Sequence, residues 1–157
     1  MFQINLPPFD INIKEEDGKT VVFDILRKRF VALTPEEWVR QHFVHYLISE
    51  KHYPAALMAN EISLSLNGMK RRADCALYNK DLSPLMLIEF KAPTVRITQK
   101  VFLQIEAYNH VFHVPWLIVS NGINHFCCRI DYEENSIKFL KDIPSYEELC
   151  SQSEDKP

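Results

Sequence analysis

The hydrophobic pattern of the chain changes period near residue 98, and this change restricts its fold more than any other feature. Between residues 60 and 90 the pattern is that of strands: "NEISLSL" and "RADCALY" flank the turn dipeptide Asn67-Gly68, and "LMLIEF" follows the loop "NKDLSP". From Thr98 onward the apolar residues recur instead at helical spacing, at Val101, Ile105, Tyr108 and Phe112. The pattern therefore predicts a three-strand meander followed by a helix that ends near "HVPW".

Further elements are expected on both sides of this segment. Thr34 as N-cap, Pro35 at the first helical position and Glu37 at the capping-box position predict a helix over "TPEEWVRQHFVHYLISEKHY". After the second helix, "WLIVS", "NHFCCRI" and "SIKFL" have the length and composition of strands. This order predicts an α/β or α+β domain, with a central mixed β-sheet flanked by helices.

The N-terminal segment alternates apolar and polar residues on both sides of Asp17-Gly18, which predicts a β-hairpin. The pattern is compatible with a third strand at Arg29 to Leu33. With 157 residues the chain suits one domain, over residues 1–150, with the hairpin at about 1–33 and the core at about 34–143. Residues 151–157, "SQSEDKP", contain no apolar residue, so a disordered tail is expected there.

Composition excludes several classes of protein. The formal charge of −3 gives no global electrostatic case for a nucleic-acid partner, so such a partner requires a local basic patch. The four cysteines have no regular spacing, which argues against a zinc ribbon or a disulfide framework and for reduced thiols. The N-terminus lacks the pattern of a secretory signal, and no apolar run approaches the roughly 18 residues of a spanning helix, so we expect a cytoplasmic protein.

Two opposite charges end an otherwise apolar strand in "LIEFKAP". Glu89 and Lys91 are two residues apart, so on a strand they share a face, about 6.6–6.8 Å apart, whereas Phe90 points to the opposite face and into the core. A second carboxylate, Asp74, lies in the mostly apolar "RADCALY". Burying a carboxylate without a partner costs several kcal/mol or raises its pKa. Two carboxylates in neighbouring strands therefore favour a cation between them.

A divalent metal suits this pair, because Mg²⁺ and Mn²⁺ prefer oxygen ligands and take one or two protein carboxylates together with water. With Asp74 and Glu89 as ligands, the metal would lower the pKa of a water molecule and polarise a phosphodiester. Lys91 would orient the nucleophile or offset the charge that builds up on phosphorus. This arrangement predicts hydrolysis of a phosphodiester.

Other polar residues could support such a reaction. Gln104 and Tyr108 lie one helical turn apart and could hold the phosphate, a water molecule or Lys91 by hydrogen bonds. Binding of phosphates requires a local patch of basic side chains. The sequence predicts that this patch is formed by Lys70, Arg71, Arg72, Arg96 and Lys100.

Three segments of the chain resemble, in the same order, the D, ExK and QxxxY motifs of the PD-(D/E)xK nuclease superfamily. They are Asp74, Glu89-Phe90-Lys91 and "QIEAY" at 104–108. The resemblance is strongest to the N-terminal nuclease domain of type I restriction enzyme R subunits and covers roughly residues 34–120. It implies a restriction-endonuclease-like fold and a Mg²⁺-dependent DNA endonuclease. Ala73 stands in place of the proline in the superfamily name.

Structural explanations compete with these roles. Asp74, Glu89 and Lys91 could form an ion-pair cluster, and Gln104 and Tyr108 could be an ordinary helix pair. Glu37 resembles a helix acid found in many such nucleases, yet the "TPEE" context favours a capping role, and Glu61 is a second candidate for a supporting acid.

The function that we expect from the sequence is a divalent-metal-dependent DNA endonuclease of the restriction type or an orphan nuclease, acting with a partner. R subunits also carry an ATP-driven translocase, and this chain has no Gly-rich phosphate loop, so a helicase, translocase or restriction-modification subunit is the expected partner. The alternative is a non-catalytic nucleic-acid-binding or assembly module that retains the nuclease fold.

Overall fold

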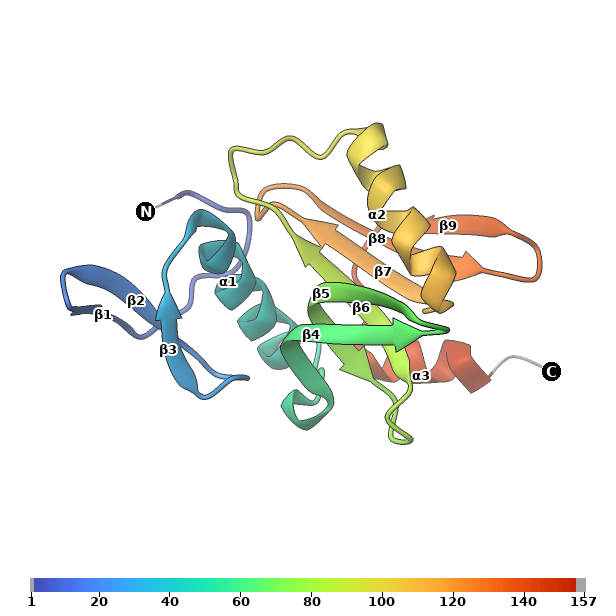
Figure 1. The fold of residues 1–157 in the computed structure, drawn as a ribbon, viewed down its shortest axis with the longest axis horizontal. Coiled ribbons are helices and arrows are strands. Elements are labelled where there is room, and N and C mark those ends of the chain that lie inside the picture. Colours follow the sequence, from blue (N-terminus) through green and yellow to red (C-terminus); the bar gives the residue numbers. More distant parts are fainter. Residues whose placement is uncertain (1, 155–157) are drawn as a thin grey trace.

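Two β-sheets and three α-helices make up the computed structural model, which describes residues 2–154 apart from the side chains of residues 108, 153 and 154 (Figure 1). The N-terminal sheet is antiparallel and contains β1 (Ile13–Glu16), β2 (Lys19–Asp24) and β3 (Arg29–Ala32). Asp17 and Gly18 join β1 to β2 with φ values of 52° and 74°, as a tight hairpin turn requires. The predicted N-terminal hairpin and its third strand are confirmed.

The second sheet has six strands in the order β4-β5-β6-β7-β8-β9. Only the central pair β6–β7 is parallel, so the sheet is mixed, as predicted. The strand bounds agree closely with the sequence pattern: β4 is Met58–Leu66, β5 Met69–Tyr78, β6 Pro84–Phe90, β7 Trp116–Ser120, β8 His125–Asp131 and β9 Ser136–Leu140.

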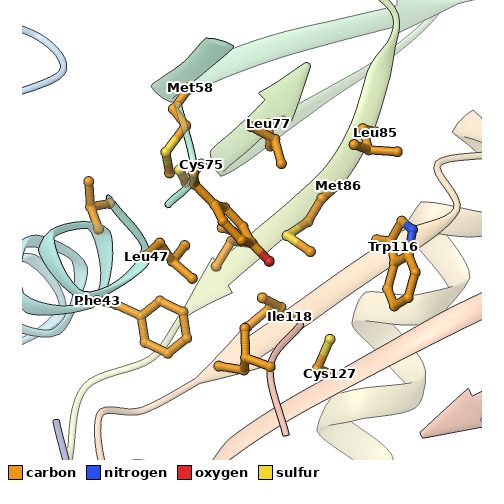
Figure 2. Close-up of a cluster of buried hydrophobic side chains, with 14 of the residues drawn as sticks. Phe43, Leu47, Met58, Cys75, Leu77, Leu85, Met86, Trp116, Ile118 and Cys127 are labelled. Atoms are coloured by element: carbon orange, nitrogen blue, oxygen red, sulfur yellow. The ribbon is translucent and has the colours of Figure 1, made fainter. Parts of the chain in front are cut away.

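The helices cover opposite faces of this sheet. Helix α1 (Pro35–Ser49) begins at the N-cap Thr34, and α2 (Gln99–Phe112) begins at the N-cap Thr98. Phe43 and Leu47 of α1 pack with Cys75, Leu77 and Phe90 in the α1-side core, which Figure 2 shows in part. On the other face, α2 contributes to the α2-side core, whose buried members include Ala73, Ala76, Leu87, Phe102, Ile105 and Leu117. A short 3-10 helix, η1 (Ala55–Leu57), leads into β4.

The alternation of side chains along β5 reverses at Asp74. Ala73 and Ala76 both belong to the α2-side core, although they are three residues apart, whereas Cys75 belongs to the α1-side core. A regular strand places only residues of the same parity on one face. Across the ladder from Asp74, Glu61 of β4 has a left-handed φ of 54°. Asp74 therefore lies at a local kink of the sheet.

A third helix, α3 (Tyr146–Glu154), follows β9 and was not predicted. It begins with a capping box, in which Glu148 N donates to Ser145 Oγ at 3.2 Å and Ser145 N donates to Glu148 Oε1 at 3.4 Å. Leu149 anchors the helix in the α1-side core with 0% exposure. Residues 151–154 are helical, in contrast to the predicted disordered tail, and 155–157 lie outside the described residues.

Within the part of the chain that the structure describes, no helix has the length and apolar character needed to cross a membrane.

Removal of the Leu149 side chain is expected to lower the free energy of unfolding by about 2–5 kcal/mol, because Leu149→Ala leaves a cavity in the core. Ser145→Ala should cost about 1 kcal/mol through loss of the N-cap. The exposed Ser151→Ala on the same helix is the control and should change stability by less than about 0.5 kcal/mol. Urea unfolding measures all three variants. Equal stability of Leu149→Ala and the parent chain would contradict the docking of α3.

Candidate active site

The end of β6 carries the two charges that share a strand face in the sequence. Glu89 and Lys91 line one cavity of about 370 Å³, together with Lys70, Arg71, Arg72 and Ile105. Phe90 points the other way, with 1% exposure, and its ring packs against Phe43 at 5.6 Å. Beyond the last residue of β6, Lys91 N donates to Ser120 O at 2.9 Å, which keeps the chain beside β7. The predicted geometry of this segment is therefore present.

The carboxylate of Asp74 lies beside the end of β6, because its Oδ2 accepts a hydrogen bond from Phe90 N at 2.8 Å. Burial, followed by the nearby charge of Asp74 and a hydrogen bond between the two carboxyl groups, raises the pKa of Glu89 from its usual 4.5 to about 8, although Arg71 acts in the opposite direction. The structure thus brings Asp74, Glu89 and Lys91 together from β5 and the end of β6.

Arg71 forms an ion pair with Glu89, with 2.6 Å between its Nη2 and Oε1 of the carboxylate. Its Nη1 donates to Asn109 Oδ1 of α2 at 3.0 Å, and its side chain is 8% exposed. Arg71 lines the same cavity as Lys70 and Arg72, but its side chain is largely buried, because Arg71 is two residues before Ala73 and shares its face toward α2. A buried guanidinium therefore already supplies part of the cation that the carboxylates require.

The remaining basic residues divide into two groups. Lys70 and Arg72 are exposed and line the cavity of Glu89, although Arg72 also pairs with Glu61 at 2.7 Å. Arg96 is exposed two residues before the N-cap of α2, and Lys100 is exposed in its first turn. The local patch predicted from the sequence is thus split between the cavity and the beginning of this helix.

Gln104 is exposed and lines a shallow depression with Gln99, Lys100, Leu103 and Ala107, separate from the cavity of Glu89. The side chain of Tyr108 lies outside the described part of the structure. From α2, Ile105 lines the cavity and Asn109 binds Arg71. The predicted helix is confirmed, and among its described side chains Ile105 and Asn109 are the ones that reach the site.

Glu37 and Glu61 are held by arginines. Glu37 Oε1 accepts from Arg27 Nη2 at 2.9 Å and from Gln41 Nε2 at 2.8 Å, and Glu61 Oε1 lies 2.6 Å from Arg40 Nη2. The backbone N of Glu37 donates to Thr34 Oγ1, which confirms the predicted N-cap. We define the arginine–carboxylate network as the charged residues joined by these contacts: Asp24, Arg27, Glu37, Arg40, Glu61 and Arg72.

The sequence reasoning did not identify Arg40 or Asn109, which are 5% and 0% exposed. Arg40 Nη1 donates to the backbone O of Asp74 at 3.2 Å, and Asn109 holds Arg71. The spacing of Glu37 and Arg40 was a usable signal, because charged residues three apart on a helix lie side by side. Asn109 carries no comparable signal in the sequence.

A divalent metal fits the donor set at this site. The described residues contain no cluster of three or more His, Cys, Asp or Glu side chains suited to a metal, but Asp74 and Glu89 form an adjacent pair. Mg²⁺ and Mn²⁺ keep several waters and need only one or two carboxylates. Burial and the nearby charge of Asp74 raise the pKa of Glu89, and a bound cation would oppose both effects.

Replacement of Glu89 by Gln is expected to stabilise the chain at alkaline pH. A pKa raised from 4.5 to about 8 stabilises the fold fully below pH 4.5, and this stabilisation is lost as the pH rises through 8. The neutral Gln resembles the protonated acid at every pH. Glu89→Gln should therefore exceed the parent chain by about 1 kcal/mol or more at pH 9 and match it near pH 4.

Urea unfolding at pH 4 and pH 9 measures this difference, with the exposed Glu133→Gln as the control that should show no pH-dependent gain. A Glu89→Gln variant less stable than the parent chain at pH 9 would show instead that Glu89 is bound as a carboxylate.

The fold of this chain is similar to that of a protein of known structure. A solved fragment assigned to an HsdR subunit of a type I restriction enzyme from Vibrio vulnificus YJ016 has a TM-score of 0.56 and 18% identity to this chain. The match covers 77% of this chain and 25% of that one, so the chain spans about a quarter of the length of this relative. At this level of identity the match shows a shared fold.

A search of curated proteins found no match. The family model of the N terminus of type I restriction enzyme R proteins matches residues 35–144, which include Asp74, Glu89 and Lys91. This range spans most of the chain from the start of α1 to the beginning of α3. The chain belongs to the family of type I restriction enzyme R protein N-terminal domains.

Proposed function

We propose that this chain is a divalent-metal-dependent endonuclease domain that hydrolyses DNA phosphodiester bonds. The observation that carries the proposal is the convergence of Asp74, Glu89 and Lys91 beside one cavity, with the exposed cations Lys70 and Arg72 at its wall. A buried carboxyl group with a raised pKa, a second carboxylate beside it, a lysine and adjacent basic side chains form a group typical of a functional site.

Asp74 and Glu89 would hold Mg²⁺ or Mn²⁺, which when bound supplies a Lewis acid that polarises the phosphodiester. Lys91 orients the attacking water or offsets the negative charge that develops on the phosphate. Lys70 and Arg72 bind flanking phosphates without reading the bases. Arg71, through its 2.6 Å ion pair, keeps the Glu89 carboxylate turned toward the cavity.

Membership of the R protein N-terminal family supports DNA as the substrate and a restriction-modification complex as the setting. Because the relative of known structure is about four times longer than the part matched here, we propose that a translocase or another restriction-modification subunit acts with this domain. The order of Asp74, Glu89 and Lys91 along the chain agrees with the PD-(D/E)xK motif.

One observation favours the alternative, a nucleic-acid-binding or assembly module without catalysis. The ion pair with Arg71 gives Glu89 a cationic partner that belongs to the protein itself. If this pair satisfied both carboxylates, a metal would be unnecessary. Against this, burial and the charge of Asp74 raise the pKa of Glu89 even with Arg71 beside it.

Replacement of Lys91 by Ala is expected to reduce the rate of DNA cleavage in Mg²⁺ or Mn²⁺ by about 100-fold or more, because charge stabilisation at the reacting phosphate is lost. The assay is nicking of supercoiled DNA and cleavage of linear DNA by the purified chain. Lys80→Ala is the matched control: Lys80 is exposed in the loop before β6, at the other end of that strand, and its removal should leave the rate unchanged.

Chelation of the metal should abolish cleavage by the parent chain, and Asp74→Ala should reproduce the loss seen with Lys91→Ala. The proposal would be contradicted by a chain that does not cleave DNA even with its translocase partner and whose DNA binding is insensitive to divalent metal and to Glu89→Gln. Such a result would support the binding module.

A further inference from the structure

The guanidinium of Arg40 joins three elements of the fold beside the candidate active site. Arg40 belongs to α1 and its side chain is 6% exposed. Its Nη2 lies 2.6 Å from Glu61 Oε1 of β4, and its Nη1 donates to Asp74 O of β5 at 3.2 Å. We infer that Arg40 is a positioning residue, which fixes the kink at Asp74 and so holds the Asp74 carboxylate beside Glu89. This inference deepens the proposed function and rests on it.

The backbone of Glu61 explains why the kink needs such support. Its φ of 54° is left-handed, and a residue with a side chain adopts this region at a cost of about 1–3 kcal/mol unless its surroundings hold it there. Both carboxylate oxygens of Glu61 are held: Oε1 by Arg40, and Oε2 by Arg72 at 2.7 Å. These contacts tie the left-handed residue to α1 on one side and to β5 on the other.

Asp74 is held from two sides at this kink. Its carbonyl oxygen accepts from Arg40, and its carboxylate oxygen Oδ2 accepts from the backbone N of Phe90 at 2.8 Å. The first contact sets the position of the backbone, and the second requires that the side chain reach the end of β6. Without the hydrogen bond from Arg40, β5 could return to the regular strand geometry in which side chains alternate between the two faces. The side chain at position 74 would then turn away from the end of β6.

Stability alone explains this arrangement poorly. Apart from the exposed Arg72, the side chains of the arginine–carboxylate network are at most 21% exposed, and buried ion pairs commonly contribute no more stability than apolar side chains of the same volume. Three buried polar atoms among the described residues lack a hydrogen-bond partner, and all lie in or against this network: Arg40 Nε, Gln41 Oε1 and Asn60 Oδ1. A network that leaves buried polar atoms without hydrogen bonds is better explained by the position in which it holds Asp74 than by stability.

The amide of Phe90 reports the position of Asp74 without any requirement for cleavage. Because this N–H donates to the Asp74 carboxylate, its hydrogen-exchange rate rises when the carboxylate moves away. The test compares Arg40→Met and Arg27→Met in the full chain by amide exchange, with Asp74→Ala as the reference for a lost contact. Arg27 is the matched control, since it is a partly buried arginine of the same network that pairs with Asp24 and Glu37.

The expected result is that Arg40→Met raises the exchange rate of the Phe90 amide at least 10-fold relative to the Leu87 and Ile88 amides of the same strand. Arg27→Met should leave this ratio unchanged, even where both variants lower the melting temperature. Arg40→Lys should restore part of the protection, because lysine keeps the charge but cannot replace both arms of the guanidinium. An unchanged Phe90 ratio in Arg40→Met, or equal effects of both methionine variants, would overturn the inference.

If Arg40→Met does not fold, Glu61→Gln provides a second test. This substitution keeps the shape of the Glu61 side chain and removes only its charge. It should raise Phe90 exchange in the same selective way, and a normal Phe90 ratio would overturn the inference. In a chain that cleaves DNA, Arg40→Met should also lower kcat 10–100-fold with little change in KM for DNA. A selective Phe90 effect in a chain that does not cleave DNA even with its translocase partner would support the positional role and contradict the proposed function.

Discussion

The structure depends on one electrostatic constraint: the Glu89 carboxyl group is buried beside a second carboxyl group, that of Asp74. Ionisation of both groups without positive charge nearby is unfavourable, and burial together with the charge of Asp74 raises the pKa of Glu89 to about 8. The features around the site respond to this constraint. The largely buried Arg71 forms an ion pair with Glu89 and a hydrogen bond with Asn109, and Lys91 lines the same cavity.

Stability and site geometry come from different parts of the molecule. The apolar clusters on the two faces of the six-stranded sheet supply most of the buried surface, with Phe90 and Leu87 on opposite faces of β6. The arginine–carboxylate network adds charge instead. It runs from Asp24 in the N-terminal sheet through α1 to Glu61 on β4. In this account Arg40 of α1 supports the kink that presents Asp74.

Regular periodicity made much of this fold predictable. The two-residue repeat of β6 predicts that Glu89 and Lys91 share a face while Phe90 is buried, and the 3.6-residue repeat predicts α2. The turn dipeptides and N-caps predict where elements begin. The prediction failed where local structure departs from the repeat or where tertiary contacts decide. The burial of Arg71 follows from its face toward α2, and the kink at Asp74 depends on a left-handed residue on the neighbouring strand.

Two further differences have physical causes. The tail was expected to be disordered from its composition, but α3 is anchored by Leu149 and by the Ser145–Glu148 capping box, which lie before the polar segment. Helical spacing places Gln104 on α2 but does not fix which side of the helix meets the site, and the structure exposes this residue.

The most direct test of the central claim is whether Asp74 and Glu89 together bind a divalent cation. Mn²⁺ is paramagnetic, so a titration followed by NMR identifies the amides closest to the bound ion. The account predicts that substoichiometric Mn²⁺ selectively broadens the amide signals of Cys75 and Phe90 in the parent chain, and that Glu89→Gln abolishes this effect. Broadening confined to other carboxylates, or the same broadening in Glu89→Gln, would contradict it.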